Sequence, residues 1–264
     1  MQAALDGLAH VGEGVRALVL GAGRLLRFVA GVLRHGLFPP WAPFMAACWA
    51  LLASCLLPVV MVVVPMGALI SLQGASIIQA FGVERLLAPL VAVTVVRELA
   101  PGFAAMMVAM QAGTALAAQV AVMRVREELE AYEMMAVDPL KHVVSPRLWA
   151  GAVVSPMLCV VAMAHAVLGA WVVAAGVRGF ASRAFLDGCL SAISRWDLAA
   201  ALIKASVFGV VISAVACFEG WHARRSAEGV GRATNRSVVG ALLGILLFNW
   251  VLNSVLYAAP AVLQ

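Results

Sequence analysis

The sequence predicts an all-α polytopic membrane protein, and three observations support this prediction. Of the 264 residues, 64% are hydrophobic and only 12% are charged, and the mean hydropathy is +1.01. Soluble globular domains usually contain about 25% charged residues. Several apolar runs are also long enough to cross a bilayer as a helix, which takes about 20 residues. Finally, the basic residues are distributed unevenly among the loops between these runs.

Residues 1–40 form a region of their own, in which basic residues interrupt an otherwise apolar segment. If this segment is helical, Arg16, Arg27 and Arg34 lie on one side and the apolar residues lie on the other. That distribution predicts an amphipathic helix in the membrane interface. A helix that packs on a partner protein is the alternative.

Residues 41–264 contain five apolar runs that we interpret as membrane spans of one domain. The runs are residues 44–72, 86–123, 143–177, 198–218 and 238–263. The second run is long, but its first part, residues 86–100, is too short to cross the bilayer alone. We therefore interpret the second run as a single tilted helix, with Pro101 as the place for a bend. Of the five cysteines, Cys189 alone is expected in a loop.

The distribution of Lys and Arg predicts the orientation of these spans. Twelve basic residues fall in the N-terminal region, between spans two and three, and between spans four and five, whereas four fall in the loops on the other side. Cytoplasmic loops are enriched in Lys and Arg, so the N-terminus is expected in the cytoplasm and the C-terminus on the opposite side. The net charge of +5 therefore does not call for a nucleic-acid partner.

The connection between spans two and three has the features of a separate short helix. It reads RVREELEAYEMMAVDPLKHVVSPR, and its first part, about 124–138, is rich in glutamate. Asp138 followed by Pro139 has the pattern of a helix start, and Ser145-Pro146 repeats that pattern. A solvated connector is the usual explanation of such a charge run. The alternative that we favour is a cytoplasmic helix that docks into a groove on a partner.

Arg97 and Glu98 are charged residues near the middle of the second run. Adjacent residues point about 100° apart on a helix, so these two cannot neutralise each other. A charge at the bilayer centre costs about 2.5–3.5 kcal/mol on insertion scales, so each needs a partner or a wet cavity. We expect Arg97, Glu98 and Lys204 to line one polar pocket in the outer half of the membrane, where Arg97 and Lys204 suit a phosphate headgroup. An ion pair that only fixes the register of spans two and four is the alternative.

Four segments carry a resemblance to a known family. They are SLQGASIIQAFGVERLLAPLVAVTVVREL (71–99), EAYEMMAVDPLKHVVSPR (130–147), KASVFG (204–209) and SAEGVGRAT (226–234). Together they make the sequence similar to the permease subunits of MlaE/YrbE-family ABC lipid transporters. The resemblance implies an interfacial N-terminal helix plus five membrane helices. The sequence departs from the family pattern at Ala100, Met110-Gln111, Gln119, Ala121-Val122 and Ala136.

The resemblance also implies partners and a location. The helix between spans two and three would be a coupling helix that sits in a cleft of an ABC ATPase subunit. On this chain the coupling residues would be Glu127, Glu128, Glu130, Ala131, Tyr132, Glu133, Met134, Asp138 and Pro139. Further implied partners are a second permease, identical or paralogous, an MCE-type lipid-binding protein, and a phospholipid held between the paired permeases. The implied location is the bacterial inner membrane.

These features predict a transport subunit and not an enzyme. The sequence has no GxxxxGK[ST] motif to cradle ATP phosphates, so ATP and Mg²⁺ are expected on the partner ATPase. No catalytic residue, cofactor or metal site is expected in this chain. The predicted function is ATP-driven transport of a phospholipid between the inner membrane and the periplasm or outer membrane. The alternative is a non-conducting subunit that scaffolds the ATPase and the MCE-type protein, pairing with a more typical permease.

Overall fold

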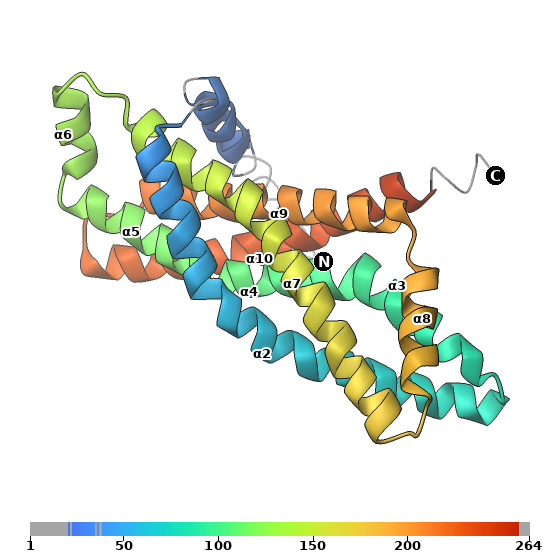
Figure 1. The fold of residues 1–264 in the computed structure, drawn as a ribbon. Coiled ribbons are helices and arrows are strands. Elements are labelled where there is room, and N and C mark those ends of the chain that lie inside the picture. Colours follow the sequence, from blue (N-terminus) through green and yellow to red (C-terminus); the bar gives the residue numbers. More distant parts are fainter. Residues whose placement is uncertain (1–20, 22, 35, 37–38, 259–264) are drawn as a thin grey trace, which may run out of the picture.

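The computed structural model of the protein describes residues 21, 23–34, 36 and 39–258. Among these residues, five helices are long and apolar enough to cross a membrane, and no β-strand is present. The helices pack into one bundle (Figure 1). The predicted class, an all-α polytopic membrane protein, is therefore confirmed, whereas its orientation in the membrane stays a prediction.

The helices follow the order of the predicted spans, with two short helices between them. They are α2 (Trp41–Phe81), α3 (Leu87–Thr94), α4 (Ala100–Val108), α5 (Thr114–Val125), α6 (Glu128–Met134), α7 (Ser145–Gly176), α8 (Ser182–Ala192), α9 (Arg195–Trp221) and α10 (Ala227–Ala258). A 3₁₀ turn, Glu84–Leu86, precedes α3. The short helices α6 and α8 lie at opposite ends of the bundle (Figure 1).

The second span is one continuous helical path, Leu87–Val125, as predicted. Two π-helical turns, Val95–Leu99 and Ala109–Gly113, join α3, α4 and α5 along it. A π turn changes the hydrogen-bonding register of a helix locally, and such turns are frequent at functional sites. The first of them contains the two charged residues that the sequence places inside this span.

Small residues allow the spans to cross at close range. A Cβ atom added to Gly209 of α9 would lie 2.1 Å from the carbonyl oxygen of Gly151 of α7. A Cβ atom added to Gly169 of α7 would lie 2.2 Å from the carbonyl oxygen of Val64 of α2. Real side chains do not approach a backbone oxygen this closely, so glycine is required at these crossings. Close approach of this kind stabilises helix pairs in membranes, where burial of apolar surface provides no driving force.

The connection between the second and third spans contains α6, and after α6 only one further helix begins. The Asp138 Oδ1 atom accepts a hydrogen bond from the N–H of Leu140, 2.9 Å away, so Asp138 caps the following helix as predicted. A π turn, Leu140–Val144, then runs directly into α7. The predicted second helix start at Ser145 is wrong, because Ser145 lies within this continuous helix. Its hydroxyl donates to the carbonyl of Gly36 and does not cap a helix.

The helix α8 corrects the expectation that Cys189 lies in a loop. Phe185 and Cys189, one turn apart, are buried, and the Cys189 Sγ atom lies 3.5 Å from the carbonyl oxygen of Ala88 in α3. The apolar spacing of four residues was the signal available for this helix. Burial raises the pKa of the Cys189 thiol to about 11.

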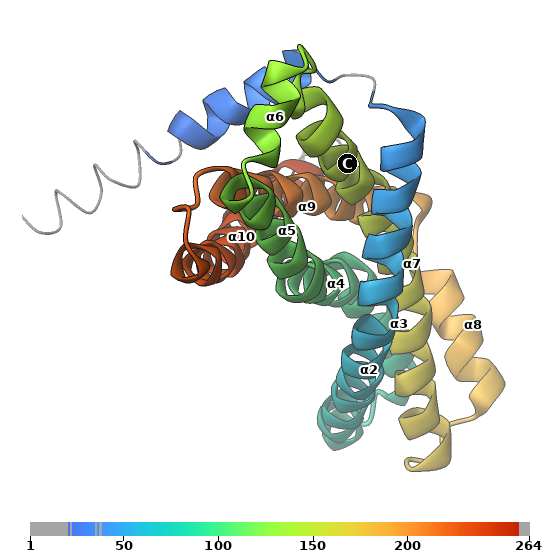
Figure 2. The ribbon, with the colours of Figure 1, turned by 90° about the vertical axis from the view of Figure 1, so that its left-hand side faces the viewer.

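Residues 23–34 are helical and lie at the end of the bundle that carries α6 (Figure 2), where Val32 shares a buried apolar cluster with Leu129. The ring of Phe28 lies 5.7 Å from that of Phe218 in α9, and Val32 is fully buried. Leu26, in contrast, is 69% exposed. One side of this helix therefore packs on the bundle. Its position in the membrane interface stays a prediction, and the part predicted over residues 1–20 lies outside the described residues.

Candidate functional site

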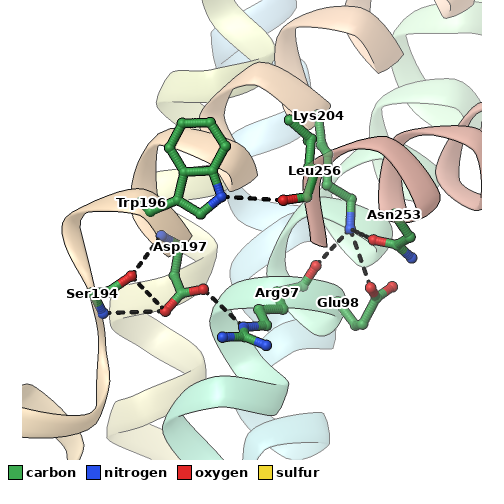
Figure 3. A network of polar contacts seen from close by, with 8 residues as sticks. All are labelled: Arg97, Glu98, Ser194, Trp196, Asp197, Lys204, Asn253 and Leu256. Carbon is green, nitrogen blue, oxygen red and sulfur yellow. Dashed lines mark hydrogen bonds and ion pairs between the residues drawn. The ribbon is translucent and has the colours of Figure 1, made fainter. Parts of the chain in front are cut away.

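Charged and polar side chains from three spans meet near the end of the bundle that carries α8 (Figure 3). We call this set the Arg97–Lys204 network. Its members are Arg97 and Glu98 of the first π turn, Ser194 and Asp197 at the start of α9, Lys204 in the first half of α9, and Asn249 and Asn253 of α10. The structure thus brings together the three residues that the sequence predicted for one polar pocket, and it adds others.

The start of α9 holds Asp197 in place. The Ser194 hydroxyl accepts from the N–H of Asp197 at 3.1 Å, and the Asp197 Oδ2 atom accepts from the N–H and the hydroxyl of Ser194 at 3.1 and 2.9 Å. This is a capping box, which satisfies donors that a helix start leaves unpaired. The other carboxylate oxygen, Oδ1, accepts from the Arg97 Nε atom at 2.8 Å. A helix cap therefore also positions a charge of the second span.

Lys204 is fully buried and has a hydrogen-bond partner for each of its donors. Its Nζ atom lies 2.7 Å from the carbonyl oxygen of Arg97, 3.2 Å from the Glu98 Oε1 atom and 2.7 Å from the Asn253 Oδ1 atom (Figure 3). An ammonium group has three N–H donors, and all three are used here. Lys204 therefore joins the second, fourth and fifth spans.

A proline four residues after Arg97 favours the contact between the Arg97 carbonyl oxygen and Lys204. In an α-helix this oxygen accepts from the N–H four residues later, and that residue is Pro101, which has no N–H. An oxygen without a partner in the membrane costs several kcal/mol. The Lys204 ammonium donates to this oxygen at 2.7 Å.

Arg97 and Glu98 are the parts of the network that remain accessible. Their side chains are 41% and 47% exposed, whereas that of Asp197 is 5% exposed. The terminal nitrogens of Arg97 have no hydrogen-bond partner among the described residues, and its Cζ atom lies 4.9 Å from the ring centroid of Tyr257. A guanidinium held by Asp197 and stacked on a tyrosine presents its remaining N–H groups in a fixed direction. Such groups suit a phosphate oxygen.

The predicted coupling residues lie on and around α6. Met134 is 90% exposed, Ala131 and Glu133 are exposed, and Leu129 is buried against the bundle. The helix is bracketed by two non-glycine residues with left-handed backbone, Glu127 with a φ of 60° and Ala136 with a φ of 57°. The helix is thus presented outward between two backbone conformations that most residues avoid.

Arg225, in the turn between α9 and α10, is a contact of α6 that sequence reasoning missed. Its Nη1 atom lies 3.0 Å from the Glu127 Oε1 atom, and its Nη2 atom pairs with the carboxylate of Glu130. One guanidinium thus links α6 to the end of the two spans that carry Lys204 and Asn253. Sequence spacing gives no signal for a pair that is about a hundred residues apart.

A cavity of about 540 Å³ lies between α2, α5 and α7, and Tyr132 of α6 contributes to its wall. Arg97, Glu98 and Lys204 are not among its lining residues. Over the described part of the chain, no group of three or more His, Cys, Asp or Glu side chains is arranged to hold a metal ion.

One protein family matches most of this chain, and several known proteins are similar to it. The family described as "Permease MlaE" matches residues 44–255. The intermembrane phospholipid transport system permease protein MlaE of Haemophilus influenzae is 35% identical over 194 residues, which cover 73% of this chain and 74% of that protein. A probable ABC transporter permease protein of Rickettsia typhi is 34% identical over 191 residues, 72% of this chain and 74% of that protein. The chloroplastic protein TRIGALACTOSYLDIACYLGLYCEROL 1 of Arabidopsis thaliana is 30% identical over 173 residues, 66% of this chain and 49% of that protein.

Proposed function

This chain belongs to the MlaE permease family, and from that membership we propose that it is the membrane subunit of an ATP-driven phospholipid transporter. Two of the relatives are named as a phospholipid transport permease and an ABC transporter permease. The observation that carries the proposal on this chain is the exposed guanidinium of Arg97, held by Asp197 inside a membrane span. A charge in that position is costly and usually marks a substrate path.

The geometry assigns different tasks to the three residues that the sequence grouped. Arg97 contacts the phosphate of the lipid, because its side chain is 41% exposed and its terminal nitrogens have no hydrogen-bond partner among the described residues. Lys204 does not fit the predicted role of a second headgroup ligand, because it is fully buried and its three donors are used. Lys204 holds Glu98 and the Arg97 backbone in register, as in the predicted structural ion pair. Arg97 keeps the headgroup-binding role of the predicted polar pocket.

The orientation follows from the distribution of basic residues. With the N-terminus in the cytoplasm, the network lies in the outer half of the bilayer and α6 lies on the cytoplasmic side. A headgroup at Arg97 is then placed for exchange with a lipid-binding protein of the MCE type on the far side of the inner membrane. A second permease, identical or paralogous, would complete the lipid path around the exposed side chains of Arg97 and Glu98.

The helix α6 is the proposed contact for the ATPase subunit. Its exposed residues, Ala131, Glu133 and Met134, would enter a groove on that subunit. Arg225 links the helix to α9 and α10, so a movement imposed on α6 would reach the spans that hold the network. ATP and Mg²⁺ would be bound by the ATPase and not by this chain.

The proposal is tested with the complex purified with its ATPase and reconstituted into phospholipid vesicles. We expect Arg97→Ala to reduce ATP-dependent lipid transfer at least tenfold while ATP hydrolysis continues, and Arg97→Lys to retain part of the transfer. Arg183→Ala removes an exposed cation of α8, outside both the network and the coupling segment, and should transfer lipid normally. Normal transfer by Arg97→Ala, and by a Glu98→Ala, Lys204→Ala double variant, would favour the scaffold alternative instead.

A further inference from the structure

The cavity between α2, α5 and α7 has one polar end and one apolar end. Gln119, Tyr132, His142 and Arg147 are the larger polar residues that line it, and Tyr132 belongs to α6. Apart from Ser54, the other lining residues are apolar, and they include Ala50 of α2 and Ala115 near the start of α5. A space with this division accepts a molecule that is polar at one end and apolar along its length.

The polar end carries positive charge without an acid to balance it. None of the residues that line the cavity is Asp or Glu. Arg147 is half-buried, its Nη1 atom donates to the carbonyl of Val143 at 2.6 Å, and none of the ion pairs among the described residues includes it. A half-buried cation without a carboxylate is costly, and an anion that enters the cavity would lower that cost.

The length of the cavity matches one leaflet of the bilayer. On α2 its lining extends from Pro43 to Ser54. That distance is about 16 Å at 1.5 Å per residue, close to half of the roughly 30 Å thickness of the hydrocarbon core. Its polar end lies beside α6, which the charge distribution assigns to the cytoplasmic side. The cavity therefore spans the cytoplasmic leaflet.

We propose that this cavity binds one anionic phospholipid of the cytoplasmic leaflet, with its phosphate at Arg147 and an acyl chain between α2 and α5. The inference rests on the orientation in the proposed function, and it adds a second lipid site near the end of the molecule opposite the Arg97–Lys204 network. Because Tyr132 belongs to α6, the bound lipid also contacts the segment that we propose for ATPase docking.

The first test counts bound lipids by native mass spectrometry of the delipidated complex after addition of phosphatidylglycerol. We expect Arg147→Ala and Ala115→Trp each to bind one phosphatidylglycerol fewer per permease than the wild type. Lys141→Ala and Val122→Trp are the matched controls, because both residues are exposed and neither lines the cavity. Both controls should bind as many lipids as the wild type.

Two outcomes of this count would overturn the proposal. One is an unchanged number of lipids in both cavity variants, and the other is an equal loss in the two controls. The same experiment separates a lipid from a free anion, because excess inorganic phosphate should leave phosphatidylglycerol bound. Displacement by inorganic phosphate would mean that Arg147 forms a simple anion site, which contradicts the proposed chain between the helices.

A second test uses a photoreactive amino acid in place of Ala50 or of Leu57, which lies on α2 outside the cavity and is 65% exposed. We expect light to attach phosphatidylglycerol at position 50, and Arg147→Ala to reduce this product at least fivefold. The product at position 57 should not depend on Arg147. Attachment of a second permease at position 50 would show that protein covers the cavity and would overturn the proposal. These readouts need no transport, so the inference and the proposed function can fail separately.

Discussion

The ammonium group of Lys204 lies 3.2 Å from the carboxylate of Glu98, and the lysine is fully buried while the glutamate is half exposed. Lys204 thus belongs to the core of the bundle, whereas Glu98 belongs to an accessible surface of a membrane span. We expect Lys204→Ala to lower the free energy of unfolding by about 2–3 kcal/mol, because the Arg97 carbonyl and the Asn253 side chain lose their partner. Thermal unfolding in detergent measures this change. The exposed Lys141→Ala variant should stay within about 0.5 kcal/mol of the wild type, and equal stability of the two variants would contradict the role of Lys204.

Replacement of glycine by alanine should have opposite effects at the crossing of α7 and α9 and at an open position in α4. Gly209→Ala would place a Cβ atom 2.1 Å from the carbonyl oxygen of Gly151, so we expect a loss of about 1–3 kcal/mol of stability. Gly102→Ala in α4 has no atom within 4 Å of the new Cβ and should raise stability by about 0.5–1 kcal/mol through helix propensity. Unfolding of both variants in the same detergent checks the pair. A Gly209→Ala variant as stable as Gly102→Ala would show that the crossing is looser than described.

The left-handed backbone of Ala136 predicts a stabilising glycine. Its φ of 57° costs about 1–2 kcal/mol for a residue with a Cβ atom, and glycine avoids most of that cost. We expect Ala136→Gly to slow hydrogen exchange of the α6 amides about two- to fivefold. The same change at Ala131, inside α6, should accelerate exchange, because glycine destabilises a helix interior. Faster exchange in Ala136→Gly would contradict the backbone assignment.

The two ion pairs of Arg225 predict a positioning role in transport. Exposed ion pairs contribute about 0.2–1 kcal/mol each, so we expect Arg225→Glu to reduce the lipid moved per ATP hydrolysed about two- to fivefold. The reversed pair, Arg225→Glu with Glu130→Arg, should recover most of that loss because it restores one of the contacts. Arg232→Ala breaks the exposed ion pair with Glu228 within α10 and tests whether loss of any exposed ion pair has this effect, and we expect no change. A reversed pair no better than the single variant would argue against the contact.

The buried thiol of Cys189 predicts slow alkylation. Burial raises its pKa from 9.0 to about 11, so at neutral pH its thiolate fraction is about a hundredfold lower than that of an ordinary thiol. Its reaction with a maleimide should accelerate as the pH rises toward 11, because the reactive thiolate then forms. A cysteine placed at the exposed Ser191, on the same helix, is the control and should react rapidly. Peptide mass spectrometry measures both sites, and rapid reaction of Cys189 at neutral pH would mean that α8 is not packed on α3.

The sequence allowed the spans and part of the site to be predicted. Hydropathy and length give the five spans, because a membrane helix must be apolar over a fixed distance. Arg97, Glu98 and Lys204 were expected together because a charge inside a span needs a partner at a depth that its side chain can reach. The spacing of Ser194 and Asp197 has the pattern of the capping box that α9 contains. These signals are local, or they depend only on depth in the bilayer.

Other parts of the site depend on how the helices are rotated, which the sequence does not state. The ion pair of Asp197 with Arg97 was not predicted, although Asp197 lies on the same face of α9 as Lys204 seven residues later. Arg225 reaches α6 across a turn that spacing alone cannot orient. The apolar face of α8 is short, and the α2–α5–α7 cavity exists only when three helices present small residues to one another.

The side of the membrane on which α6 lies tests the proposed function most directly, because an ATPase subunit can dock on α6 only in the cytoplasm. Met134 is 90% exposed, so a cysteine in its place offers an accessible thiol. We predict that a membrane-impermeant maleimide labels this cysteine in inverted vesicles and not in intact spheroplasts, and that the bound ATPase protects it. Labelling in intact spheroplasts would place α6 on the far side of the membrane and contradict the account.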